Sequence, residues 1–270
     1  MESDRKTAQL LMQISNTLLN SLNGAIAASD MMAKQLERQP PENAESVSAY
    51  LAALRHNQFQ VLRVAENMQT LAALQLDHAC LKQETVDLWE LCDDLADSIR
   101  TLVPDIPVTV LPSSDTFLTC CDPGLVEKLL LNLIANSLRH CSRDDEVRIQ
   151  LLRNDDTLQV IVIDNGSGIP RENMDTLFSD YLREVDLSDT ARGAGLGLSV
   201  AEAIAKAHGG SLVITGEAGH GTKAVFSLPH AWAGYLRSSR AVYRSNGHMR
   251  TLLTELSDVC DFHKFQSPFL

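Results

Sequence analysis

The chain has 270 residues, which is long enough for two modest domains with separate cores. Hydrophobic residues make up 44% of the chain but aromatic residues only 5%, so we expect aliphatic cores. The net charge of −12 argues against a nucleic-acid-binding surface. No apolar run is long enough for a membrane-spanning helix and the N-terminus is not a signal peptide, which predicts a soluble, cytoplasmic protein without membrane contact. The six cysteines form no Cys-x-x-Cys pair, which favours free thiols over a zinc site.

Two long helices are predicted at the N-terminal end. Residues 7–36 repeat apolar side chains every three or four positions until Pro40 and Pro41, at Leu11, Ile14, Leu18, Leu22 and Ile26. A second helix shares one apolar face formed by Leu51, Leu54, Val61, Val64, Met68 and Leu71. One hairpin cannot bury both stripes, so we expect a homodimer with a four-helix bundle. The alternative is that the stripes pack against the rest of the same chain.

A second domain is expected to begin near residue 80. Residues 81–88 suggest a short link or strand, residues 89–102 a helix and residues 104–110 a strand. A further helix covers residues 125–138, and Asn132 and Asn136, four positions apart, share one of its faces with Arg139 nearby. Amide oxygens together with phosphates suit Mg²⁺. The alternative is a polar helix face without a ligand.

Two glycine clusters follow. The apolar strand 158–163 ends at Asp164, whose carboxylate could accept a hydrogen bond from an amine such as that of adenine, with Gly166 and Gly168 allowing close approach. The alternative there is an Asn-Gly hairpin turn. The second cluster, residues 192–200, opens an Ala-rich helix over residues 198–208 that closes on Gly209-Gly210, and backbone N–H groups at a helix N-terminus bind phosphate. A dinucleotide-binding fingerprint competes, but residues 183–190 before this cluster are polar and suit a mobile lid better than a strand.

In order and spacing these motifs resemble the N box and the two glycine boxes of the histidine-kinase catalytic domain. Gly219-His220-Gly221-Thr222, before the predicted strand 223–228, is similar to the last box of that family, and Leu177-Phe178 to the Phe-containing box of its lid. The resemblance covers roughly residues 5–230. It implies an α+β fold, with an antiparallel helical hairpin followed by an α/β two-layer sandwich of the histidine-kinase, gyrase and chaperone ATPase type.

The resemblance further implies ATP and Mg²⁺ as cofactors, and a response regulator or a partner histidine kinase as partner. Asp164 would then hold adenine, Asn136 would hold Mg²⁺, and Arg139 would contact a phosphate. The whole expected cofactor-binding set is Asn132, Asn136, Arg139, Asp164, Gly166, Gly168, Ile169, Gly193, Gly195, Leu196, Gly197, Leu198 and Thr222.

The first helix departs from the family pattern at the phosphoacceptor histidine. Alignment of residues 14–23 places Asn16 at that histidine and Thr17 at the acid that follows it, while Leu19 and Ser21 replace an Arg and a Pro. An amide nitrogen is not a nucleophile at neutral pH and Thr17 cannot replace a carboxylate base, so self-phosphorylation is not expected. His56, about two turns from the expected level of Asn16, is an unfavoured substitute.

Two functions therefore stay open. The intact nucleotide boxes favour a kinase that phosphorylates a histidine of another chain in trans. The lost acceptor motif favours a regulatory pseudokinase that dimerises, binds nucleotide and controls a genuine kinase or response regulator. ATP hydrolysis as the main activity is disfavoured, because Asn132 stands where the related gyrase and chaperone ATPases place a water-activating Glu.

The expected organisation is a hairpin over residues 1–80, an ATP-binding domain over 81–230 and an extension over 231–270 of unknown role. The extension carries a local positive patch formed by Arg237, Arg240, Arg244 and Arg250. We expect it to pack back on an acidic surface of the chain; the alternative is that it docks a partner.

Overall fold

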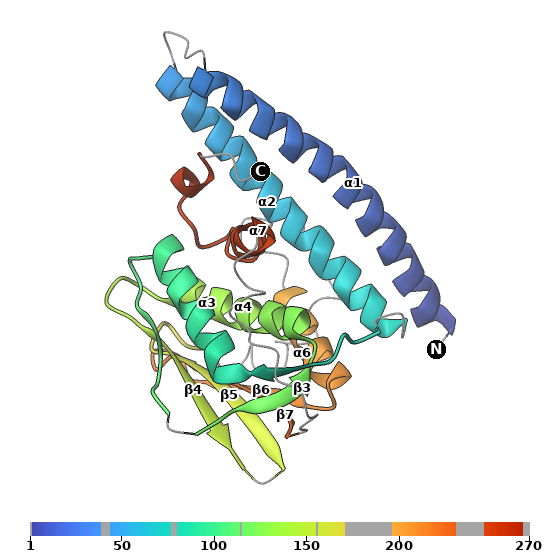
Figure 1. Cartoon of the computed structure of the whole chain (residues 1–270), viewed down its shortest axis with the longest axis vertical. Helices are drawn as coiled ribbons and strands as arrows, with labels where there is room; N and C mark the ends of the chain where they lie inside the picture. The colour runs from blue at the N-terminus through green and yellow to red at the C-terminus, as the bar shows by residue number, and fades with distance from the viewer. Residues whose placement is uncertain are drawn as a thin grey trace. The chain divides into compact units, whose positions relative to one another are not determined.

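The computed structural model describes residues 2–38, 44–76, 80–113, 115–154, 156–170, 196–230 and 246–266. These residues form two compact units, of which the first combines Met1–Leu76 with Ser245–Leu270 and the second is Asp77–Arg244. Helices precede a mixed helix and sheet region, which confirms the α+β class (Figure 1). Within the described parts of the chain, no helix combines the length and hydropathy needed to cross a bilayer.

The first unit is built on two long antiparallel helices, α1 (Glu2–Arg38) and α2 (Ala44–Gln75), which lie side by side (Figure 1). The predicted apolar stripes are only partly buried within it. Ile26, Leu51 and Leu71 are buried, whereas Ile14, Leu18, Leu54 and Val61 are exposed. The hairpin thus keeps an apolar surface that the described residues do not cover.

A C-terminal segment completes the first unit. It consists of α7 (Asn246–Glu255) and the short 3-10 helix η3 (Phe262–Phe265), and both pack against α2. This chain therefore covers one face of α2 with its own residues, but the stripe residues Leu54 and Val61 stay exposed. Among the tail arginines, Arg250 donates a hydrogen bond to Asn23 of α1, while Arg237, Arg240 and Arg244 lie outside the described residues.

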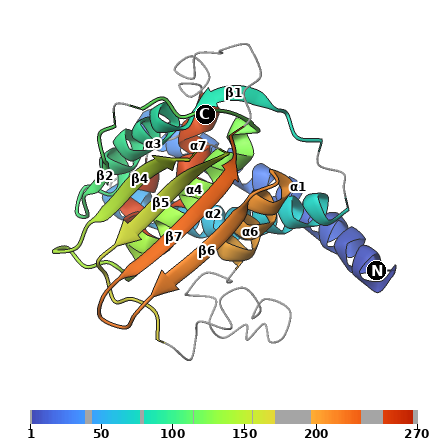
Figure 2. The same cartoon turned by 90° about the horizontal axis from the view of Figure 1, so that it is seen from below.

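The second unit is a five-stranded sheet with helices on one face, as Figure 2 shows. Its strands follow the order β2 (Val108–Val110), β4 (Val147–Arg153), β5 (Thr157–Asp164), β7 (Thr222–Pro229) and β6 (Ser211–Gly216). Among the strands that the structure describes, only the β2–β4 pair is parallel. A separate antiparallel ladder joins β1 (Glu84–Asp87) to β3 (Leu118–Cys121).

The covering helices are α3 (Leu88–Leu102), α4 (Pro123–His140) and α6 (Leu196–Ala207). The side chains of Asp87 and Asp122 cap α3 and α4 by accepting hydrogen bonds from backbone N–H groups two and three residues on. Gly209, at a φ of 70°, ends α6 with paired backbone bonds. The core is aliphatic as predicted, with fully buried side chains that include Leu129, Ile134, Val160, Val200 and Ile204.

Candidate functional site

The site is centred on Asp164, the last residue of β5. This position follows from the sequence, because the alternating and largely buried strand Thr157–Asp164 ends at the first glycine cluster. The side chain is only 4% exposed. Its Oδ1 atom accepts hydrogen bonds from the backbone N–H groups of Gly166 (3.2 Å) and Thr222 (3.1 Å). Oδ2 accepts none from the described residues, so the carboxylate is oriented and one oxygen remains for a ligand amine.

Three glycines allow the backbone segments around Asp164 to approach one another closely. A Cβ at Gly166 would lie 2.3 Å from the carbonyl oxygen of His140, and a Cβ at Gly221 would lie 2.0 Å from the carbonyl oxygen of Asp164 itself. At Gly168, where φ is 68°, a Cβ would lie 1.9 Å from the Glu217 carbonyl oxygen. Side chains are therefore excluded at these positions, and the loop after β5 closes against both α4 and the loop after β6.

Two backbone hydrogen bonds fix this loop in place. The Ser167 N–H donates to the His140 carbonyl at 3.0 Å, and the Gly219 N–H donates to the Ser167 carbonyl at 2.7 Å. The observed loop is thus more than the Asn-Gly hairpin turn that the sequence left open, because β5 pairs with β7 rather than with the next strand in a tight hairpin. The next residue, Ile169, packs close to Gly216, where an added Cβ would lie 3.4 Å from the Ile169 side chain.

The pKa values of two titratable groups at the end of α4 are shifted by their surroundings. Desolvation, aided by the charge of Arg139, lowers the pKa of His140, although Asp164 opposes the change. Burial, followed by the carboxylates of Asp164 and Asp145, raises the pKa of the Cys141 thiol to about 12. His140 and Cys141 are therefore neutral at pH 7.

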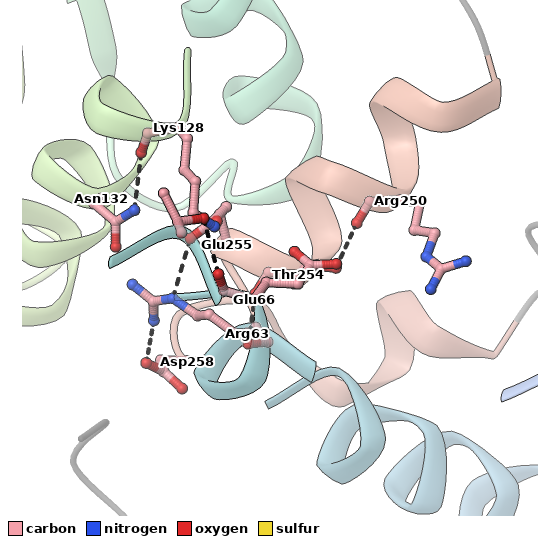
Figure 3. Close-up of polar contacts among 10 residues, drawn as sticks. Arg63, Glu66, Lys128, Asn132, Arg250, Thr254, Glu255 and Asp258 are labelled. Carbon is pink, nitrogen blue, oxygen red and sulfur yellow. Dashed lines mark hydrogen bonds and ion pairs between the residues drawn. The ribbon is translucent and has the colours of Figure 1, made fainter. Parts of the chain in front are cut away.

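The expected metal and phosphate residues lie on α4. Asn132 is 1% exposed and its Nδ2 atom donates to the Lys128 carbonyl at 2.8 Å (Figure 3). Asn136, one turn further, and Arg139 are half-buried. An amide oxygen of Asn136 fits a Mg²⁺ ion that takes its other ligands from phosphate and water. The described residues contain no cluster of three or more His, Cys, Asp or Glu side chains that could hold a metal alone.

The second glycine cluster is described only in part. Leu196, Gly197 and Leu198 form the first turn of α6, with Leu196 buried and the other two half-buried. This is the helix N-terminus that the sequence predicted for the phosphates. Gly193, Gly195, the Phe-containing box at Leu177-Phe178 and the lid segment 183–190 lie outside the described residues.

In the first unit, the degenerate acceptor position is exposed and has a partner. The Oδ1 atom of Asn16 accepts a hydrogen bond from the Nε2 atom of Gln69 on α2 at 2.7 Å. The sequence predicted Ala65 as the opposite residue, so the pairing of the helices differs by four residues, about one turn. Thr17 is exposed and its hydroxyl donates to the Gln13 carbonyl of its own helix at 3.0 Å.

Sequence reasoning missed Gly221, although it included the neighbouring Thr222. The role of Gly221 depends on the pairing of Thr222 with Asp164 across β7 and β5, which brings two distant segments together. The spacing of Gly219 and Gly221 was the available signal, since both have a φ of 80°.

Residues 121–231 match the family described as histidine kinase-, DNA gyrase B- and HSP90-like ATPase. Curated relatives match far more of the chain. The adaptive-response sensory kinase SasA of Crocosphaera subtropica is 26% identical over 231 residues, which is 82% of this chain and 59% of the relative. The histidine protein kinase DivJ of Caulobacter vibrioides is 26% identical over 225 residues, covering 82% of this chain and 37% of the relative. The chain thus spans less than two thirds of either relative.

Two solved structures share the fold. Full-length ShkA in complex with AMPPNP has a TM-score of 0.64 and 24% identity, and the match covers 86% of this chain and 48% of that one. The histidine kinase AdeS of Acinetobacter baumannii has a TM-score of 0.53 and 20% identity, covering 80% and 95%. Residues 121–231 therefore resemble the ATPase domain of the histidine-kinase, gyrase and HSP90 class in sequence and in fold. The relatives that also match the helical hairpin are named as sensory or histidine kinases, so the chain is similar to that family over both parts.

Proposed function

We propose that the chain binds Mg²⁺-ATP and acts in a two-component pathway by phosphorylating a histidine of a partner protein. The observation that carries this proposal is Asp164. Its carboxylate is 4% exposed and two backbone N–H groups hold its Oδ1 atom, so the side chain is oriented for a hydrogen-bond donor at Oδ2. An adenine amine is such a donor.

This proposal assigns one contact with Mg²⁺-ATP to each element of the site. Asp164 fixes the base, Asn136 supplies an oxygen to Mg²⁺, and Arg139 neutralises phosphate charge. The first turn of α6 offers backbone N–H groups to the phosphates. Bound ATP supplies the γ-phosphate. Asn132 cannot act as the base of an ATPase, because it is a neutral amide and its nitrogen donates to its own helix.

Transfer in trans is proposed because the chain offers no suitable acceptor at the aligned position. Asn16 has no nucleophilic nitrogen, and its amide holds Gln69. His56 does not replace it, since its Nε2 atom lies 2.7 Å from the Ser257 carbonyl oxygen and its ring packs against Phe265. A nitrogen that donates to a carbonyl is not available for attack on phosphorus, which leaves Nδ1 of this half-buried ring as the nitrogen with a lone pair.

The second candidate function is a regulatory pseudokinase, and the Asn16–Gln69 hydrogen bond favours it. Asn16 stands at the position that receives phosphate in kinases, and here its side chain forms a hydrogen bond between α1 and α2. Under this alternative, the chain binds nucleotide and controls a genuine kinase or response regulator without transferring phosphate.

Homodimerisation is part of both proposals. Ile14 and Leu18 on α1 and Leu54 and Val61 on α2 are between 38% and 51% exposed. A second copy of the hairpin could bury these side chains in a four-helix bundle.

Incubation with ATP labelled at the γ-phosphate, alone and with candidate partners, separates the two functions. Acid-labile, base-stable label on a partner supports transfer in trans. Nucleotide binding together with an altered labelling rate of a partner kinase, but no transfer, supports the pseudokinase. Label on this chain in the absence of a partner contradicts both. Genes adjacent to this one for an acceptor-bearing kinase or a response regulator would name the partners to test.

A further inference from the structure

The C-terminal segment, residues 246–266, contacts a basic and aromatic face of α2. This face is formed by Arg55, His56, Phe59 and Arg63, whose spacing places them on adjacent turns. Arg63 is 7% exposed and pairs with two carboxylates of the segment. Its Nε atom lies 3.4 Å from Glu255 Oε2, and its Nη1 atom contacts Asp258 (Figure 3).

Aromatic and backbone contacts extend the same interface toward Arg55. The ring of Phe265 lies 5.1 Å from the His56 ring at 63° and 5.3 Å from the Phe59 ring. The Nη1 atom of Arg55 donates to the Gln266 carbonyl at 3.2 Å, while Nη2 forms an ion pair with Asp30 of α1 at 2.5 Å. Acidic and aromatic groups of the segment thus meet basic and aromatic groups of α2.

This composition is typical of a recognition surface rather than of a hairpin core. Arginine and aromatic side chains are enriched where proteins dock, and a buried ion pair is only weak evidence of stabilisation. The segment contacts α2 across about 200 positions of sequence, since His56 and Ser257 are 201 residues apart.

We propose that the C-terminal segment is an intramolecular latch on a docking face of α2, and that a partner protein binds this face with an acidic, phenylalanine-bearing segment of its own. The latch excludes the partner until it is displaced. Latch opening therefore exposes Arg55, His56, Phe59 and Arg63 to the partner. This inference goes beyond the proposed nucleotide chemistry and does not rest on it.

The test uses the full chain and a fluorescent peptide of residues 246–266 with Cys260→Ser, measured by fluorescence anisotropy. In the double variant Glu255→Lys with Asp258→Lys, repulsion from Arg63 opens the latch but leaves the face on α2 unchanged. We expect this variant to bind the peptide at least 10-fold more tightly than the original chain. Adding Arg63→Glu should abolish the gain. Asp97→Lys, which reverses an exposed carboxylate paired with Arg100, is the matched control and should not change binding.

A second readout reports the latch without the peptide. Cys260 is 6% exposed, and its alkylation, located by peptide mass spectrometry, should be at least 10-fold faster in the double variant. If the double variant loses helicity, Phe265→Ala, which removes only the ring contacts, replaces it and should speed labelling several-fold. Unchanged labelling in a folded variant overturns the latch. Faster labelling without any gain in peptide binding overturns the docking face, because the segment is then only a structural part of the hairpin.

Discussion

Asp164→Asn is the sharpest perturbation of the proposed nucleotide site. The substitution keeps an oxygen that can accept from Gly166 and Thr222, but it replaces Oδ2 by an amide nitrogen. That nitrogen would present a donor to the adenine amine, which is also a donor. Losing a hydrogen bond to a charged acceptor costs about 1.5–3 kcal/mol. We therefore expect ATP affinity to fall roughly 10- to 100-fold in titration calorimetry.

Three further measurements distinguish the loss of one hydrogen bond to the ligand from a loss of domain stability. The thermal midpoint should change little, because both backbone bonds to the side chain are retained. Alkylation of Cys141 should be faster, since one of the carboxylates that raise the pKa of its thiol is gone. Asp105→Asn, at an exposed carboxylate paired with Arg143 at 3.5 Å, is the control and should bind ATP normally. Equal affinity of the Asp164→Asn variant and the original chain would refute our assignment of the adenine site.

Three further outcomes are expected. The purified chain alone should gain no acid-labile, base-stable phosphate from labelled ATP, and such label mapped to His56 would show that our view of its hydrogen bond is wrong. The double variant Ile14→Glu with Leu18→Glu should sediment as a monomer at concentrations where the original chain is a dimer, because both exposed side chains belong to the proposed interface; a monomeric original chain would contradict the bundle. Gly168→Ala should lower the free energy of unfolding in denaturant titrations. The φ of 68° alone costs about 1–3 kcal/mol, and the contact of the new Cβ with the Glu217 carbonyl adds to this cost. Gly24→Ala, at a helical site with nothing within 4 Å, should instead raise the free energy of unfolding by about 0.5–1 kcal/mol, and a similar loss at both positions would argue against the close approach at Gly168.

Long periodic segments could be predicted from the sequence because their signal is local. Helices were expected over residues 7–36 and 89–102, and the structure has them at Glu2–Arg38 and Leu88–Leu102. The strand expected over 104–110 is shorter, at Val108–Val110, since only these residues pair with β4. β3, β4 and β6 were not predicted individually, because short strands depend on partners distant in the sequence.

At the site, too, features with a local sequence signal were predicted and features that depend on distant residues were not. Asp164 and the glycines after it were identified because a motif of nine residues carries them. The packing of α7 and η3 against α2 could not be derived, because it depends on pairs such as Arg63 with Asp258, 195 residues apart. The register of α1 against α2 was off by one turn at Asn16, since counting from the turn at Pro40 takes no account of how the helices pack. The residue roles at the ATP site stay predictions.

The close backbone contacts at Gly166, Gly168 and Gly221 have a consequence for binding energetics. They order the Asp164 carboxylate and its loop while the domain folds, so little conformational entropy is left to lose when a ligand arrives. The proposed base-binding end of the site is therefore preorganised, and its affinity for a nucleotide base should depend on hydrogen-bond complementarity rather than on induced ordering. A ligand that carries the base but no phosphates should, for that reason, still be able to bind.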